Sequence, residues 1–125
     1  MTDKQLELAK QQLREEMNSK GYGWIDGKHI KPSPELYLRD RELWCIEMIN
    51  SILAYQGRGM EDAEAVMQSE ERRYHNYLAY YVQLLGRDRV VELIQAQIDD
   101  IKFVAQNVGT DSEGCTYNSI IWRDE

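Results

Sequence analysis

The sequence predicts a mainly α-helical fold, in which a four-helix core carries a small β-hairpin. Four segments repeat apolar residues at helical spacing, and each is followed by a glycine: Gly21, Gly57, Gly86 and Gly109. Glycine is favoured just past a helix because the chain there often takes a positive φ. An Asp-Gly pair between two short β-prone stretches predicts the hairpin. No linker or repeat divides the 125 residues, so we expect a single helical domain, 1–125, with a small β appendage.

The first two helices are predicted over about Asp3 to Lys20 and Glu35 to Gln56. The first has a narrow apolar stripe and charged residues elsewhere, which is typical of a surface helix. The second is apolar around most of its circumference, so we expect it at the centre of the core. Ser33 is a favourable N-cap for this helix, and Pro34 suits the first helical position, where its missing N–H costs nothing.

The third and fourth helices are predicted over about Met60 to Leu85 and Asp88 to Val108. Asp88 is a plausible N-cap for the fourth helix. Only a few residues around Gly86 separate the two helices, and so short a connection favours an antiparallel helical hairpin.

Two short segments outside the helical pattern are rich in β-forming residues. Residues 22–31 predict a β-hairpin with Asp26-Gly27 at its turn, because a type I′ turn needs positive φ at both central residues. The C-terminal segment 116–122 reads Thr-Tyr-Asn-Ser-Ile-Ile-Trp and predicts a strand. A two-stranded ribbon alone is marginally stable, so we expect the tail to join the hairpin as a third strand or to pack across it.

Composition and motifs exclude several classes of protein. The chain has 15 Lys+Arg against 22 Asp+Glu and a net charge of −7, so we expect no direct nucleic-acid binding. No apolar run is long enough to span a membrane. Cys45 and Cys115 lie outside any metal or redox spacing, which favours free thiols in the cytoplasm. Phosphate-loop, dinucleotide, zinc-protease and nucleophile-elbow motifs are absent. We therefore expect a non-enzymatic protein without metal or cofactor.

One carboxylate interrupts the apolar face predicted for the third helix. Glu70 falls among apolar residues there, and Arg39 occupies a similar place on the second helix. A buried carboxylate is costly unless it is paired, so we expect an Arg39–Glu70 ion pair or a hydrogen bond from a tyrosine hydroxyl to Glu70. The alternative is a polar ligand pocket between the second and third helices that includes Tyr74 and Tyr77. Tyr74, Tyr77 and Tyr81 recur at helical spacing, which is more typical of a core than of a ligand cage.

Aromatic and arginine side chains supply candidate partner-binding residues. Arg73 and Tyr80 fall together at the edge of the predicted apolar face, and this pair of residue types is enriched at protein interfaces. Phe103 points away from the apolar stripe of the fourth helix, so it either packs under the β appendage or anchors a partner. Trp24 and Trp122 offer the same alternatives, because so small a sheet can bury only one face.

The sequence therefore predicts a non-enzymatic protein-binding regulator or inhibitor. Its size, acidity and lack of catalytic motifs resemble those of accessory proteins of phages and mobile elements, among them inhibitors of host defence systems; the resemblance transfers no residues. The alternative is a binder of a small nucleotide-like ligand, or a minor enzyme, that uses Arg39, Glu70 and the nearby tyrosines. Homodimerisation is compatible with both. The acidic residues are dispersed along the chain, which favours an ordinary soluble surface over a mimic of nucleic acid.

Overall fold

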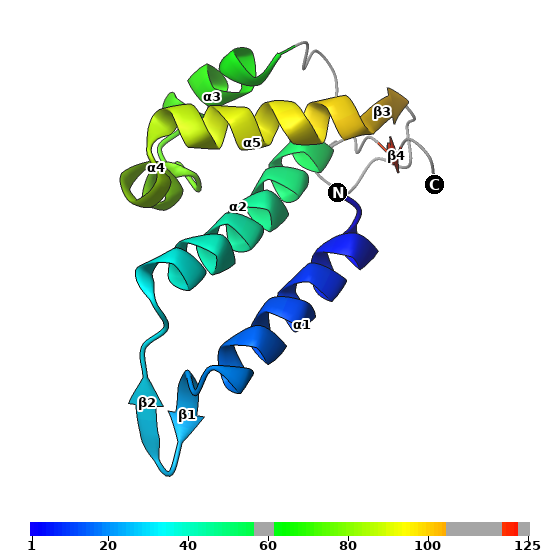
Figure 1. Ribbon diagram of the computed structural model, residues 1–125. Helices are drawn as coiled ribbons and strands as arrows, with labels where there is room; N and C mark the ends of the chain where they lie inside the picture. Colours follow the sequence, from blue (N-terminus) through cyan, green and yellow to red (C-terminus); the bar gives the residue numbers. More distant parts are fainter. Residues whose placement is uncertain (57–61, 105–118, 123–125) are drawn as a thin grey trace, which may run out of the picture. The chain divides into compact units, whose positions relative to one another are not determined.

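The computed structural model describes residues 1–56, 62–104 and 119–122 and has five helices and two antiparallel strand pairs (Figure 1). The elements in chain order are α1 (Asp3–Ser19), β1 (Gly23–Ile25), β2 (Lys28–Ile30), α2 (Pro34–Gln56), α3 (Ala63–Glu71), α4 (Ala79–Leu85), α5 (Arg87–Asp100), β3 (Ile101–Val104) and β4 (Ser119–Trp122). The predicted class, mainly α-helical with a small β-hairpin, is confirmed. The chain divides into two compact units, Met1–Trp44 and Cys45–Glu125, and α2 contributes to both.

The first unit begins with a helix whose N-terminus is capped by side chains. The Thr2 hydroxyl accepts from the backbone N–H of Gln5 at 3.1 Å, and the Gln5 side chain accepts from the backbone N–H of Thr2 at 2.8 Å. This reciprocal capping box satisfies two N–H groups that the first turn would otherwise leave unpaired. The helix ends as predicted, with Gly21 at φ +82° just beyond it.

The predicted hairpin and the start of α2 are confirmed in this unit. Strands β1 and β2 pair antiparallel in the register Gly23–Ile30, Trp24–His29 and Ile25–Lys28. Asp26 and Gly27 at the turn have φ of +50° and +78°, the positive values that a type I′ turn requires. Helix α2 begins at Pro34, and its N-cap Ser33 accepts from the backbone N–H of Leu36 at 3.3 Å.

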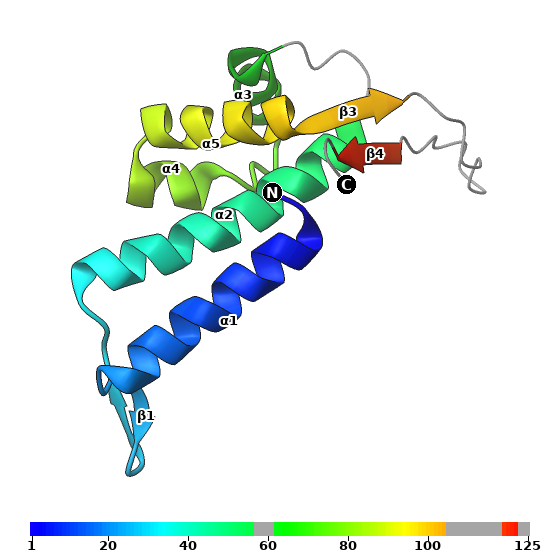
Figure 2. The same cartoon turned by 45° about the vertical axis from the view of Figure 1, so that its right-hand side comes forward.

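The second unit is built around a continuous apolar core. It draws on the C-terminal half of α2, on α3 and on α5, and α5 packs against both α3 and α4 (Figures 1 and 2). The most deeply buried members are Cys45, Ile49, Leu53, Met67, Leu78, Val90 and Ile94. One polar pair lies inside this unit, where the Gln97 amide donates to the Asn50 side-chain oxygen at 2.6 Å. Pairing the two amides avoids the cost of burying either one alone.

The third predicted helix is interrupted, because residues 72–78 leave the helical conformation between α3 and α4. Two side chains bond to the backbone at this break. Asn76 Oδ1 accepts from the N–H of Leu78 at 3.0 Å, and Glu70 Oε1 accepts from the N–H of Tyr77 at 3.4 Å. Such bonds offer backbone N–H groups an alternative to the helical ladder, so the expectation of one helix from Met60 to Leu85 is wrong.

The fourth predicted helix is shorter at both ends. It begins at Arg87 with Gly86 as N-cap at φ +88°, and Asp88 lies in its first turn instead of capping it. It ends at Asp100, and Ile101–Val104 form β3, which pairs with β4 in a sheet separate from the hairpin. The tail therefore forms a strand as predicted, but its partner is β3. The run Ile-Lys-Phe-Val favours a strand once a partner strand is available. Gly57, Gly109 and residues 116–118 lie outside the described residues.

Candidate functional site

The break between α3 and α4 exposes the tyrosines that the helical pattern assigned to the core. Tyr74 is 95% exposed and Tyr77 57% exposed, whereas Tyr81 on α4 packs against the core as expected. The expectation that Tyr74 and Tyr77 share one buried stripe is wrong, because it projects them on a helix that stops at Glu71. These two aromatic side chains are therefore available at the surface.

Glu70 is fully buried, as its place among apolar residues predicted. Its Oε2 lies 3.9 Å from Nε of Arg73, and its Oε1 accepts from the backbone N–H of Tyr77. Arg39 pairs with Glu16 of α1. Each residue thus has a charged partner within its own unit, and the Arg39–Glu70 ion pair, which would join the two units, stays a prediction.

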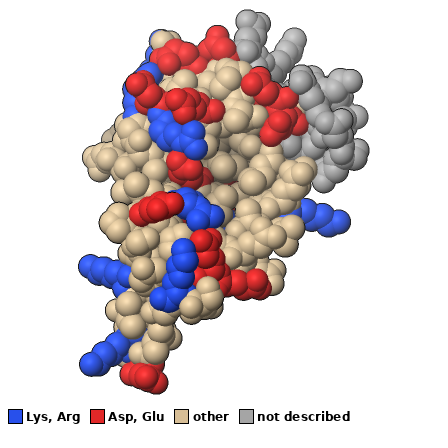
Figure 3. All heavy atoms as spheres, viewed as in Figure 1, with Lys and Arg blue, Asp and Glu red and all other residues tan. Residues whose placement is uncertain are grey.

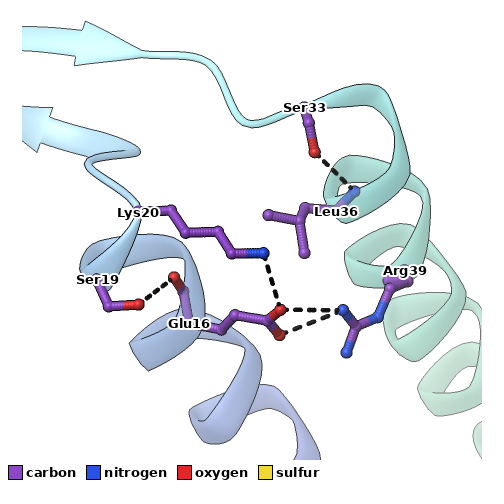
Figure 4. A network of polar contacts seen from close by, with 6 residues as sticks. All are labelled: Glu16, Ser19, Lys20, Ser33, Leu36 and Arg39. Carbon is purple, nitrogen blue, oxygen red and sulfur yellow. Dashed lines mark hydrogen bonds and ion pairs between the residues drawn. The ribbon is translucent and has the colours of Figure 1, made fainter.

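Glu16 links the end of α1 to the start of α2 (Figure 4). Its carboxylate accepts from Lys20 Nζ at 3.2 Å and from Arg39 Nη1 at 3.2 and 3.4 Å. The hydrogen bond from Lys20, followed by the charge of Arg39, holds the pKa of Glu16 below its ordinary value, against the opposing effect of desolvation. Arg39 therefore joins α2 to α1 through an ion pair within the first unit, and its side chain is half exposed.

A small pocket in the second unit lies beside the break. This Tyr55 pocket, of about 530 Å³, is lined by Met48, Ser51, Ile52, Tyr55, Arg73 and Tyr77. The Arg73 guanidinium lies 5.7 Å from the ring centroid of Tyr55, a cation–π distance. Two predicted residues, Arg73 and Tyr77, therefore come together on one pocket with the C-terminal half of α2. Sequence reasoning missed Tyr55, which is 59% exposed, because it was counted with the apolar residues of the helix.

A larger pocket lies within the first unit, between α1, the hairpin and the start of α2. This α1–α2 pocket has a volume of about 730 Å³. Its charged and ring-bearing lining residues are Lys10, Arg14, Tyr22, His29, Lys31, Tyr37, Asp40, Arg41 and Trp44. Among the described lining residues, four cations thus accompany one carboxylate, which is the reverse of the charge balance of the whole chain.

Two of these cations are held by aromatic rings. Lys10 is only 7% exposed, with its Nζ 3.9 Å from the ring centroid of Trp44 and 3.7 Å from the exposed carboxylate of Glu7. Arg41 pairs with Asp40 at 2.6 Å, and its guanidinium carbon lies 5.9 Å from the Trp44 centroid. The buried charge of Lys10 is tolerated because the indole face of Trp44 and the carboxylate of Glu7 attract it.

Sequence reasoning missed this pocket, although a signal for it was present. Lys10, Arg14 and Met17 recur at helical spacing on α1, and Tyr37, Arg41 and Trp44 do so on α2. Each set places cations and large side chains on one helix face. The pattern is visible only when both faces are known to meet, and that meeting depends on the hairpin between the two helices.

The other predicted partner-binding residues lie in four different elements. Trp24 of β1 is 77% exposed and lies 5.2 Å from the His29 ring, measured between centroids. Tyr80 of α4 is 49% exposed and meets Tyr81 edge to face. Phe103 lies in β3 opposite Ile120, and Trp122 lies in β4 opposite Ile101; their side chains lie outside the described part of the structure. Trp24 and Tyr80 are therefore exposed aromatic residues, as a partner-binding role requires.

Charged side chains of both signs are interspersed on the face shown in Figure 3. Within residues 1–56, 62–104 and 119–122, no three His, Cys, Asp or Glu side chains gather as a metal site would need. None of the helices in the described part of the chain combines the length and the apolar character needed to cross a membrane.

Compared with protein-family models, with curated proteins and with solved structures, the chain shows no significant match. What the protein does is therefore inferred from the chemistry of the two pockets.

Proposed function

We propose that the chain is a non-enzymatic protein-binding module whose contact surface is centred on the Tyr55 pocket. The observation that supports this is the break at residues 72–78, which brings exposed tyrosines and an arginine to the rim of an apolar pocket. Such a protein would act as a regulator or inhibitor of its partner, as do the accessory and anti-defence proteins of phages that it resembles in size and acidity.

The side chains around this pocket have the chemistry of an interface hot spot. Tyr55, Tyr77 and Arg73 supply flat contact area together with hydrogen-bond donors, and Met48 and Ile52 supply an apolar floor. Tyrosine and arginine are enriched at interfaces because they combine these properties at a modest cost in conformational entropy. The partner we expect carries one large apolar side chain for the pocket, flanked by acceptors for the tyrosine hydroxyls and for Arg73.

The exposure of Tyr74 and Tyr77 is better explained by binding than by folding. Neither residue is needed to fill the core, since Leu78 beside them is completely buried and occupies that role. The hydrogen bond from this segment to Glu70 uses the backbone N–H of Tyr77, not its ring. The tyrosine rings can therefore be removed without losing the backbone hydrogen bond that stabilises the non-helical segment 72–78.

The test is an affinity capture from lysate of the source organism with the wild-type chain and two variants, Tyr55→Ala and Tyr77→Ala. We expect one protein to be retained in a stoichiometric amount by the wild type. Each variant should bind that purified protein about tenfold or more weakly, with an unchanged melting temperature. Leu8→Ala is the matched control, because Leu8 is 56% exposed and lies on α1, outside the pocket.

Two results would contradict the proposal. One is that no protein is retained in a stoichiometric amount by the wild type. The other is that a retained protein binds Tyr55→Ala and Tyr77→Ala as tightly as it binds Leu8→Ala.

A further inference from the structure

We propose that the α1–α2 pocket of the first unit binds a small anion that carries a flat ring, of the nucleoside monophosphate class. None of the described residues that line this site also lines the Tyr55 pocket, so the two proposals are tested independently. The volume of the pocket is about 730 Å³, which falls within the range of roughly 300–1,000 Å³ that is typical of small-ligand sites.

Local charge is the first reason to expect an anion. Lys10, Arg14, Lys31 and Arg41 line the pocket, and Asp40 is the only carboxylate among those lining residues that the structure describes. This local excess of positive charge, on a chain with a net charge of −7, attracts an anion to the cavity. Arg41 pairs with Asp40 and Lys10 lies near Glu7, which leaves Arg14 and Lys31 as the two cations for a ligand.

Two of these cations are available to a ligand. Arg14 and Lys31 are exposed, and neither forms an ion pair with any residue that the structure describes. Lys10 differs, because the ring of Trp44 holds its ammonium group at the pocket wall. A phosphate group suits this arrangement, since it offers several strong acceptor oxygens to donors that approach from different elements.

Aromatic side chains in the same cavity supply the second requirement. Tyr22, His29, Tyr37 and Trp44 line the pocket together with Met17 and Pro32. Planar ligand groups stack on such side chains, and on the guanidinium plane of an arginine, with little dependence on the identity of the base. A site with cations alone would suit inorganic phosphate, whereas this mixture of rings and cations suits a phosphate attached to a base.

The test is titration calorimetry of the full chain with AMP, GMP, CMP and UMP, with the matching nucleosides and with inorganic phosphate. We expect at least one nucleoside monophosphate to bind, and to bind at least tenfold more tightly than its nucleoside or inorganic phosphate. Arg14→Gln and Lys31→Gln should each weaken its binding by about tenfold to a hundredfold, because each removes a charge-assisted hydrogen bond. Lys28→Gln, a neighbouring hairpin cation outside the pocket lining, is the matched control and should change affinity less than twofold.

Fluorescence gives a second readout that locates the ligand. The chain has three tryptophans; of the two whose side chains the structure describes, Trp24 and Trp44, only Trp44 lines this pocket. Ligand-dependent quenching should disappear in Trp44→Phe and persist in Trp24→Phe. The proposal is overturned if no nucleoside monophosphate binds at millimolar concentration, or if inorganic phosphate binds equally well. It is also overturned if the two pocket variants bind as tightly as Lys28→Gln does. Tyr55→Ala and Tyr77→Ala should leave nucleotide affinity unchanged, which separates this proposal from the protein-binding function.

Discussion

Replacing Glu70 by glutamine should lower the unfolding free energy by less than about 1 kcal/mol, whereas replacing it by alanine should lower it by about 2–4 kcal/mol. Glu70 is completely buried, and its Oε1 accepts from the N–H of Tyr77 across the break between α3 and α4. Glutamine keeps an acceptor oxygen at the same place. It loses the 3.9 Å ion pair with Arg73, whose side chain is 39% exposed and therefore screened by solvent.

Alanine removes the acceptor as well as volume. Leaving the N–H of Tyr77 without its partner costs about 1–3 kcal/mol, and the lost buried methylene adds about 1 kcal/mol. The assay is urea denaturation followed by far-ultraviolet circular dichroism, with the slope of the transition checked for each variant. Because Glu70 also holds the segment that presents Arg73 and Tyr77, the alanine variant should bind the protein partner more weakly than the glutamine variant.

The reasoning would be refuted if Glu70→Gln were as unstable as Glu70→Ala. In that case the negative charge of Glu70, and not its acceptor oxygen, would stabilise the conformation of residues 72–78. Equal stability of all three proteins would contradict it in another way, because the N–H of Tyr77 would then be satisfied by water at no cost.

Two further predictions concern α5. A hydrogen bond from Arg87 holds the pKa of Glu64 below its ordinary value of 4.5, and the charge of Arg87 also contributes. The ion pair therefore stabilises the folded state at pH values above 4.5. This stabilisation is lost as the pH falls through the lower pKa of the folded state. The stability difference between the wild type and Glu64→Gln should accordingly shrink on acidification, and a difference that is constant with pH would contradict this. Gly86→Ala should cost about 1–3 kcal/mol, because Gly86 has φ +88° and ψ 148°, a region nearly closed to other residues, while a Cβ there would meet nothing within 4 Å. Thermal unfolding tests this cost, and an alanine variant as stable as the wild type would exclude strain at this position.

Local signals were sufficient for several elements. Ser33 caps α2, the Asp26-Gly27 turn closes the hairpin, and Gly21 and Gly86 take positive φ at helix ends. Each of these features depends on a residue and its neighbours within about one helical turn, so the physical cause is contained in a short stretch of sequence. The burial of Glu70 was also predictable, because Ala63 and Met67, seven and three residues before it, lie on the same buried face of one short helix.

Helical periodicity, by contrast, could not reveal where a helix stops. Residues 72–78 continue the apolar spacing of α3, but the buried carboxylate of Glu70 and the amide of Asn76 bond to the backbone there. Likewise, Ile101–Val104 could extend α5 on spacing alone, and they become a strand because β4, from the C-terminal tail, pairs with them. Both outcomes depend on competing hydrogen bonds that local propensity does not include.

The candidate binding sites depended most on tertiary structure. Arg73 and Tyr80 were found from residue type alone, and both are exposed, but the pocket beside Arg73 includes α2 residues far away in the sequence. The α1–α2 pocket was not predicted at all, although each of its two cation-bearing helix faces is present in the sequence. The sequence by itself determined which helices form and how several of them end, because those choices are made within a few residues. Only tertiary structure decided which faces meet, because a pocket is formed by groups whose separation along the chain is unrelated to their separation in space.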